Sequence, residues 1–213
     1  MYPNLDIGMT QFEITTQSHA QTEEIAAMLA SLLVGGETIA LRGDLGAGKT
    51  CFARGLASGL GCDDGQVSSP TFIVLQRYRG ARIDLVHVDA YRLSNPEQLR
   101  DSGLELGAHD SVAAIEWAER VESELPADTI TVSLLATSAS ERAISIHAPQ
   151  NFIERLALSM SPRPCAICKA PVEFLCATKP FCSKRCRDVD LGRWIDGRYQ
   201  ISRPIEQTDL DED

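Results

Sequence analysis

The residues with the clearest chemistry form the run G-D-L-G-A-G-K-T at positions 43–50. It fits the pattern G-x-x-x-x-G-K-[ST], whose glycines let successive backbone N–H groups converge on the phosphates of a nucleotide. In this pattern Lys49 reaches the β- and γ-phosphates and Thr50 binds Mg²⁺. The sequence therefore predicts a site for ATP or ADP with Mg²⁺. The residues expected at the nucleotide are Gly43, Leu45, Gly46, Ala47, Gly48, Lys49 and Thr50.

The residues on either side of this run support the prediction. Residues 38–41 form a short apolar run typical of a strand, and Phe52, Leu56 and Leu60 recur at helical spacing before Gly61. Strand, loop and helix thus follow in the order that a phosphate-binding loop requires. A glycine-rich turn with a surface lysine is the alternative interpretation.

Two carboxylates follow apolar runs in the way expected of strand ends. Asp89 ends the run 85–89, and Glu116 ends the run 112–116. Because nucleotide sites lie at the carboxyl ends of sheet strands, these acids are candidates for holding a metal ion or an attacking water. With Lys49 they form the candidate catalytic set. A helix cap or a surface charge is the alternative for each acid.

Strands and helices alternate along residues 18–158, which predicts an α/β fold. A capping-box pattern at Ser18 opens a helix that is expected to reach the glycines at 35 and 36. Beyond the helix that follows the loop, another is expected to start at residues 94–97, and residues 150–158 predict a closing helix. The last two strands alternate apolar and polar residues, which indicates an antiparallel pair with one wet face. We expect a P-loop NTPase-like three-layer sandwich with a mixed sheet, plus a small zinc-stabilised domain. The strands are expected at residues 38–41, 72–78, 85–89, 112–117, 129–135 and 143–147.

Composition limits the function classes. The 213 residues are 44% hydrophobic with a net charge of −10, so one buried core is expected and a broad nucleic-acid-binding face is not. The first residues carry neither a basic segment nor a long apolar run, so we expect a cytoplasmic protein that does not enter the membrane.

Five of the seven cysteines lie between residues 165 and 186. Cys165 and Cys168 form one tight pair, and Cys182 and Cys186 form another, a spacing that suits two knuckles around one tetrahedral Zn²⁺. No histidine follows the first of these cysteines. We therefore predict a four-cysteine zinc site with Cys176 as a bystander. An iron–sulfur cluster is the alternative.

Composition also changes along the chain. Residues 159–164 are short and proline-rich, residues 159–205 carry 9 Lys and Arg against 4 Asp and Glu, and the last eight residues add five acidic side chains. We expect a P-loop domain at 1–158, a linker at 159–164, a zinc module at 165–205 and a disordered acidic tail at 206–213.

Four motifs in order give residues 10–150 a resemblance to the TsaE family. They are G-D-L-G-A-G-K-T ending at Thr50, S-P-T ending at Thr71, D-A-Y-R-L starting at Asp89, and I-E-W ending at Trp117. The resemblance implies an ATPase that works with the proteins TsaB and TsaD to make threonylcarbamoyladenosine at position 37 of tRNA. The tRNA would be engaged indirectly through that complex.

The same resemblance implies roles for single residues. Thr50 and Glu116 would hold Mg²⁺, and Asp89 would assist the metal or water. Thr71 would belong to a nucleotide-sensing segment, and Trp117 would lie beside the site. A phosphate-transferring kinase, or a nucleotide-gated binding switch without turnover, is the rival function.

The carboxyl-terminal segment has a resemblance of its own. The run F-C-S-K-R-C at 181–186, the run D-L-G-R-W at 190–194 and the acidic end resemble the small zinc protein family YacG over residues 162–213. This resemblance implies a module that binds and inhibits DNA gyrase. A zinc-stapled tail that only stabilises or docks the ATPase is the alternative.

Overall fold

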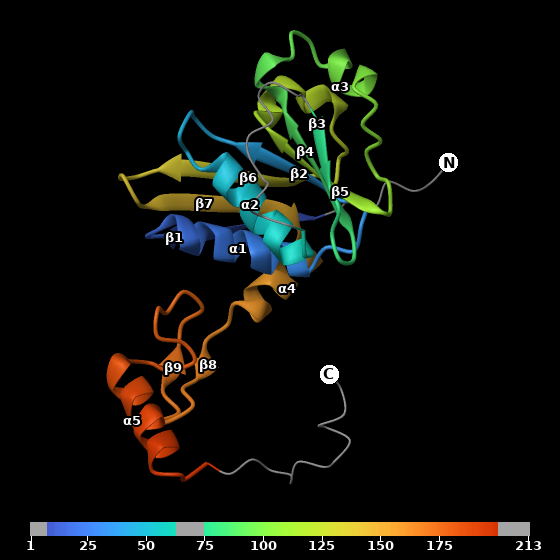
Figure 1. Cartoon of the computed structure of the whole chain (residues 1–213). Coiled ribbons are helices and arrows are strands. Elements are labelled where there is room, and N and C mark those ends of the chain that lie inside the picture. Colours follow the sequence, from blue (N-terminus) through green and yellow to red (C-terminus); the bar gives the residue numbers. More distant parts are fainter. Residues whose placement is uncertain (1–7, 63–74, 200–213) are drawn as a thin grey trace, which may run out of the picture. The chain divides into compact units, whose positions relative to one another are not determined.

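The chain folds into two compact units, Met1–Met160 and Ser161–Asp213, in a computed structural model that describes residues 8–62 and 75–199 (Figure 1). The predicted nucleotide-sensing segment with Thr71, and the first three residues of the strand expected at 72–78, lie outside the described residues. The acidic tail lies outside them as well.

Seven strands in the described residues form one sheet in the larger unit. They are β1 Met9–Thr16, β2 Thr38–Arg42, β3 Leu75–Tyr78, β4 Asp84–Asp89, β5 Ser111–Glu116, β6 Ile130–Ala136 and β7 Arg142–Pro149. Their order is β1-β7-β6-β2-β5-β4-β3. β2 runs parallel to β5 and β6, and β4 runs parallel to β5. The pairs β1–β7, β6–β7 and β3–β4 are antiparallel, so the sheet is mixed, as predicted.

Helices lie on both faces of this sheet. α1 His19–Ser31 and α2 Lys49–Leu60 pack against each other, and α4 Gln150–Ser159 lies against β1, β7 and α1. The short helix α3 Glu97–Asp101 and the 3₁₀ turns η2 Ala90–Arg92, η3 Ala118–Arg120 and η4 Glu122–Glu124 lie on the β2-β5-β4 side.

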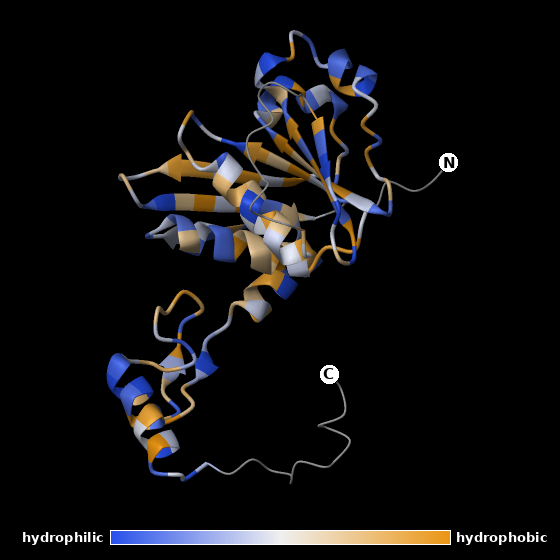
Figure 2. Ribbon diagram, viewed as in Figure 1, coloured by the Kyte–Doolittle hydropathy of each residue, from blue (hydrophilic) through white to orange (hydrophobic). Residues whose placement is uncertain are grey.

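The central strands of the sheet are apolar and buried between the two helical layers. Every residue of β5 is buried, and β2 is buried up to its last residue. Figure 2 shows hydrophobic residues along the central strands. The three-layer fold predicted from the sequence is therefore confirmed. No helix in residues 8–62 and 75–199 is long and apolar enough to cross a membrane.

The antiparallel strands β6 and β7 have one buried and one solvent-exposed face, as predicted. Val132, Leu134, Ile144 and Ile146 are buried, whereas their neighbours along the strands are more exposed. This alternation places one face of the hairpin in the core.

Several element boundaries differ from the predictions. β1 was not predicted. Helix α1 ends at Ser31 rather than near residue 35, because the Glu37 carboxylate accepts hydrogen bonds from the N–H groups of Val34 and Gly35 at 2.9 and 2.8 Å. These bonds close the connection to β2 and stop the helix. β5 ends at Glu116, so Trp117 leaves the strand that was expected to include it.

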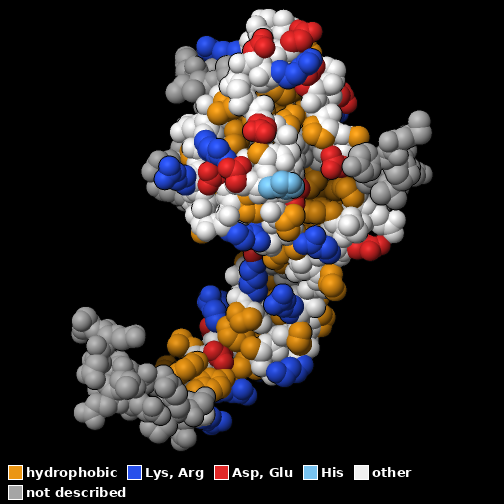
Figure 3. All heavy atoms as spheres, turned by 90° about the vertical axis from the view of Figure 1, so that its right-hand side faces the viewer, with side chains coloured by type: hydrophobic (Ala, Val, Ile, Leu, Met, Phe, Trp, Pro, Cys, Tyr) orange, Lys and Arg blue, Asp and Glu red, His pale blue; other side chains and the backbone are white. Residues whose placement is uncertain are grey.

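The smaller unit has little core of its own. Its elements are β8 Arg163–Pro164, β9 Pro171–Val172 and α5 Lys184–Ile195. Among its described residues only Cys165 and Val172 are buried, and α5 buries none. Figure 3 shows Lys and Arg side chains on this unit beside exposed hydrophobic ones. Apolar burial is too small here to hold the fold without another constraint.

The packing of α2 on α1 depends on glycine. A Cβ atom on Gly59 would lie 2.5 Å from the carbonyl oxygen of Ala27 and 2.7 Å from the Cβ of Ala30. Gly55 approaches the α1 backbone just as closely one turn earlier. We expect Gly59→Val to force the helices apart and to lower the free energy of unfolding by about 1–3 kcal/mol.

Chemical denaturation of the full chain measures this change. Ser58→Ala alters an exposed side chain on the same helix and is the control, with an expected change within about 0.5 kcal/mol. An unchanged midpoint for Gly59→Val would contradict the close packing of the two helices.

Candidate functional site

The phosphate-binding loop joins the end of β2 to the start of α2 and is shaped by glycines. Gly43, Gly46 and Gly48 have φ angles of 139°, 80° and 108°, which other residues rarely adopt. A Cβ atom on Gly43 would lie 2.3 Å from the carbonyl oxygen of Leu134, because the loop passes close to β6. Helix α2 begins directly after Gly48, so its unpaired N–H groups and positive end face the loop.

Lys49 lies buried at the start of α2, with 5% of its surface exposed. Its Nζ donates hydrogen bonds to the carbonyl oxygens of Gly43 at 2.6 Å and Asp44 at 2.9 Å, and lies 3.7 Å from the centre of the Trp117 ring. Burial lowers the pKa of Lys49, against the pull of nearby carboxylates that include Glu116. The ammonium group is therefore held by neutral partners that phosphate oxygens could replace.

Thr50 and Glu116 face each other next to the loop. The Thr50 hydroxyl lies 2.8 Å from Oε1 and 3.1 Å from Oε2 of Glu116, and the carboxylate is almost fully buried. Hydroxyl and carboxylate oxygens are ligands that Mg²⁺ prefers. The pair could hold a magnesium ion beside the loop.

Asp89 ends β4 directly beside Glu116, with which it pairs in the sheet. Its Oδ1 accepts a hydrogen bond of 2.9 Å from the N–H of Tyr91 and so caps the turn η2. The Tyr91 and Trp117 rings lie 5.1 Å apart, and Trp117 has a left-handed backbone with φ 57°. Two aromatic side chains therefore stand next to the two carboxylates.

These groups surround one pocket of about 520 Å³. Gly43 and Ala47 shape the loop without lining the pocket, and Leu45 at the tip of the loop is 91% exposed. The lining residues that were predicted as site residues are Leu45, Gly46, Gly48, Lys49, Thr50, Asp89 and Glu116. Trp117 also lines the pocket, as the motif resemblance implied.

Arg142 is a pocket residue that sequence reasoning missed. It is buried at the start of β7, and its guanidinium donates hydrogen bonds to the carbonyl oxygens of Gly46, Ser138 and Glu141 at 3.3, 3.1 and 2.8 Å. Its Nε has no partner among the described residues. An arginine at a strand start has no distinguishing pattern in the sequence. Only the pairing of β7 with β6 brings it to the loop.

His87 is another residue at the site that sequence reasoning missed. It lies in β4, is completely buried, and places Nε2 2.9 Å from Oε1 of Glu116. A histidine inside an apolar run has no distinguishing pattern in the sequence.

Acidic and basic side chains line different sides of the pocket. Acidic Asp89 and Glu116 come from the β4 and β5 side, and basic Arg142 comes from the β7 side, with Lys49 at the loop. This arrangement suits an anionic ligand that carries a divalent cation at one end. A magnesium-bound nucleotide has this charge pattern.

The second site lies in the smaller unit. The sulfur atoms of Cys165, Cys168, Cys182 and Cys186 all lie within 4.8 Å of one another. The distance is 3.4 Å from Cys168 to Cys182 and 3.7 Å from Cys182 to Cys186. Tetrahedral zinc with Zn–S bonds of about 2.3 Å places its sulfur ligands about 3.8 Å apart. The four thiols therefore fit a zinc ion, as the spacing predicted.

Backbone turns build this cluster. The N–H of Lys169 donates to the carbonyl of Cys165 at 3.0 Å, and Lys169 adopts φ 65°, which closes the first knuckle. The Ser183 hydroxyl accepts a hydrogen bond from the N–H of Cys186 at 3.3 Å, so the fourth cysteine sits in the first turn of α5. The backbone thus positions both cysteine pairs.

The thiols do not ionise alike. Backbone N–H groups, foremost that of Cys168, lower the pKa of Cys165 to about 6. Hydrogen bonds with the thiols of Cys168 and Cys186 raise the pKa of Cys182 to about 12. A dication would replace the remaining protons, so acid weakens metal binding at such a site.

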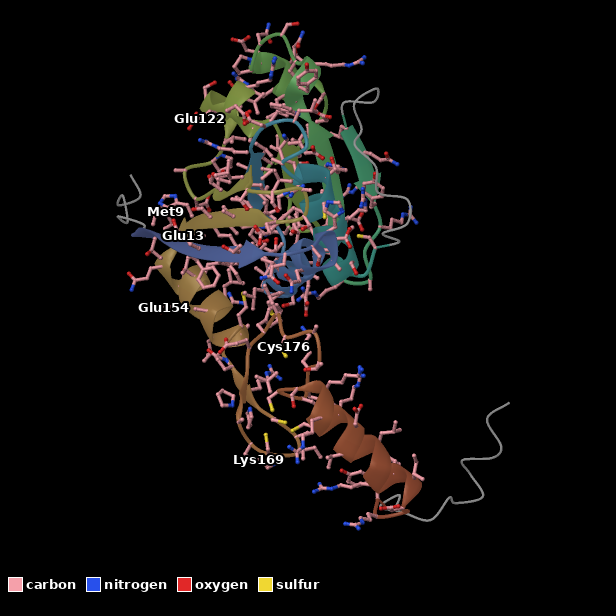
Figure 4. The ribbon with its side chains drawn as sticks, turned by 90° about the vertical axis from the view of Figure 1, so that its left-hand side faces the viewer. Met9, Glu13, Glu122, Glu154, Lys169 and Cys176 are labelled. Carbon is pink, nitrogen blue, oxygen red and sulfur yellow. The ribbon has the colours of Figure 1, made fainter. Side chains whose placement is uncertain are left out.

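Cys176 does not belong to the cluster. Its sulfur lies 3.3 Å from the Thr178 hydroxyl and 3.6 Å from the carbonyl oxygen of Phe181. Figure 4 shows it apart from the sulfur atoms near Lys169. It serves as a natural control for the four clustered thiols.

The fold and the loop define a P-loop protein of the α/β class. Residues 16–144 match the family model "Threonylcarbamoyl adenosine biosynthesis protein TsaE", and the chain belongs to this family. It is 41% identical to the TsaE protein of Treponema pallidum over 132 residues, 62% of this chain and 96% of the relative. It is 34% identical to the Bacillus subtilis TsaE protein over 154 residues, 72% of this chain and 96% of the relative.

A solved structure has the same fold. The crystal structure of Bacillus subtilis YdiB aligns with a TM-score of 0.56 and 30% identity, covering 70% of this chain and 96% of that one. Residues 163–212 match the family model "DNA gyrase inhibitor YacG", a range that includes all four clustered cysteines. Both family resemblances noted in the sequence are therefore confirmed.

Removing one clustered thiol tests the zinc site. Cys182→Ser is expected to lower bound zinc from roughly one ion per chain to near zero, because the other three thiols cannot close a tetrahedral site. Elemental analysis of purified protein measures the zinc, and circular dichroism follows the loss of α5. Cys176→Ser is the matched control and should keep its zinc. Equal zinc loss in both variants would contradict the four-thiol assignment.

Proposed function

We propose that the larger unit is the ATP-hydrolysing component of the machinery that makes N6-threonylcarbamoyladenosine at position 37 of tRNA. Membership of the TsaE family supports the pathway. The enzymatic part is supported by the hydrogen bond of the half-buried Thr50 to the buried Glu116, beside Lys49 at the start of α2. A phosphate-binding loop with an adjacent oxygen pair suits Mg²⁺-dependent hydrolysis.

Each lining residue has a proposed task. The loop N–H groups and Lys49 bind the phosphates, with Lys49 exchanging its carbonyl contacts for phosphate oxygens. Thr50 and Glu116 hold Mg²⁺. A magnesium ion held by these two residues would supply positive charge that stabilises the negative charge developing on the phosphate oxygens. Asp89 orients the attacking water or a metal-bound water.

Arg142 adds a second positive charge on the β7 side of the loop. Because its guanidinium contacts Gly46 and its Nε has no partner among the described residues, it both supports the loop and offers a donor to an anion. We infer that this charge helps to compensate the negative charge of the phosphates in the pocket.

We propose TsaB and TsaD as the partners. Hydrolysis would drive turnover of the complex, and tRNA would be bound through those proteins. The acidic balance of the larger unit is consistent with indirect contact with tRNA. Such a reaction belongs to the cytoplasm, where tRNA is modified.

Two rival functions make different measurable products. A kinase on the same loop would form ADP only in proportion to a phosphorylated acceptor. A nucleotide-gated switch would bind ATP tightly and release no phosphate. Phosphate release with and without the TsaB–TsaD pair separates all three.

Substitution of the metal-binding acid tests the proposed chemistry. Glu116→Gln is expected to lower Mg²⁺-dependent phosphate release by about 100-fold or more while the fold survives, because a neutral amide is a poor magnesium ligand. Lys49→Ala should remove nucleotide binding or hydrolysis. Steady-state phosphate assays with the TsaB–TsaD pair, together with ADP binding by calorimetry, measure both effects.

The control is Glu154→Gln, an exposed carboxylate on α4 that does not line the pocket (Figure 4). It should release phosphate at the wild-type rate. Normal turnover in Lys49→Ala would overturn the assignment of the loop.

We propose that residues 165–205 form a zinc module joined by the linker 159–164 to the ATPase domain 1–158, with 206–213 as an acidic tail. The YacG match supports an action on DNA gyrase. The exposed Trp194 and Ile195 on α5, beside basic side chains, give the module a surface suited to a protein partner. A structural zinc tail is the alternative.

A supercoiling assay separates these two roles of the module. The full chain is expected to inhibit purified DNA gyrase, and Trp194→Ala is expected to weaken inhibition about tenfold because an exposed aromatic anchor is lost. Lys49→Ala alters only the ATPase site and should inhibit like the wild type. No inhibition by zinc-loaded wild-type protein would favour the structural tail.

A further inference from the structure

His87 contacts the carboxylate of Glu116 without lining the pocket. It lies in the middle of β4, with no exposed surface, and pairs with Ala114 of β5. Its Nε2 lies 2.9 Å from Oε1 of Glu116. Because a carboxylate oxygen accepts, His87 must carry a proton on Nε2 to make this bond.

The other ring nitrogen supports a dedicated role. Nδ1 of His87 is buried and has no hydrogen-bond partner among the described residues. Burying an unpaired polar atom costs stability, and an apolar side chain would avoid that cost. The hydrogen bond to Glu116 is the interaction that a leucine or methionine at this position would lack.

Glu116 is therefore held from two sides. Thr50 lines the pocket and hydrogen-bonds to the carboxylate from that side. His87 does not line the pocket and hydrogen-bonds to Oε1 from the buried side. The Thr50 hydroxyl is itself a proposed magnesium ligand, so its bond to Glu116 competes with the metal. The bond from His87 does not compete, because it comes from the buried side.

We propose that His87 is a positioning residue for the magnesium site: its Nε2–H fixes the carboxylate of Glu116 in the orientation that binds Mg²⁺ with the nucleotide. This inference rests on the proposed function of the pocket. Hydrogen-bond partners that orient metal ligands typically change metal affinity by about 10–100-fold when they are removed.

Two variants separate the hydrogen bond from simple packing. His87→Gln keeps an amide N–H at a reach similar to that of Nε2, whereas His87→Met has similar length and no donor. His147→Met is the control, because this histidine lies on the exposed face of β7. His87→Asn is polar but too short to reach Glu116, and replaces His87→Met if that variant does not fold.

The measurements use the full chain and do not depend on turnover. Calorimetry gives the affinity for ADP in excess Mg²⁺ and in EDTA, and Mn²⁺ binding to the ADP complex is followed by electron paramagnetic resonance. His87→Met should weaken Mn²⁺ binding about tenfold and keep ADP affinity in EDTA within about twofold of the wild type. His87→Gln and His147→Met should resemble the wild type.

Two results would overturn the inference. One is wild-type metal affinity in folded His87→Met. The other is equal loss in His87→Met and His87→Gln, which would make the role one of packing. Failure of the proposed function looks different: wild-type protein would then bind Mg²⁺ and ADP normally but release no phosphate from ATP with the TsaB–TsaD pair.

Discussion

The site depends on the register of three parallel strands. Leu41 of β2 pairs with Glu116 of β5, and Glu116 pairs with Asp89 of β4, so two carboxylates end beside the strand from which the phosphate-binding loop leaves. A slip of one residue would turn every side chain of a strand to the opposite face. Burial of β2 and β5 on both faces prevents such a slip, because it would bury the wrong side chains. The core of the larger unit thus fixes the geometry of its polar pocket.

The fold of the smaller unit does not depend on a hydrophobic core. Its helix α5 buries no side chain, and its two strands have two residues each. The four sulfur atoms occupy the place that a hydrophobic core occupies in the larger unit. A zinc ion bound to these sulfur atoms would couple metal binding to folding in this unit, whereas the larger unit has a hydrophobic core of its own. The two halves of the chain can lose their structure under different conditions.

The sequence predicts those parts of the site whose chemistry is local. The loop ending at Thr50 and the cysteine pairs are each encoded by short spacings that rarely arise by chance, and Glu116 was placed by the apolar run that it ends. His87 and Arg142 could not be found this way, because their contacts exist only after distant strands pair. Strand β1 was missed because its polar residues leave only a weak apolar alternation, and the edge pairing with β7 supplies the rest of its stability.

Trp117 combines an unfavourable backbone conformation with a side-chain contact to Lys49. Its left-handed backbone, φ 57°, costs about 1 kcal/mol or more in a residue other than glycine, and that conformation turns the chain from β5 into η3. A glycine would relax the backbone but would remove the ring over which Lys49 lies. Relief of the backbone strain at this position and retention of the aromatic face that Lys49 contacts are therefore mutually exclusive.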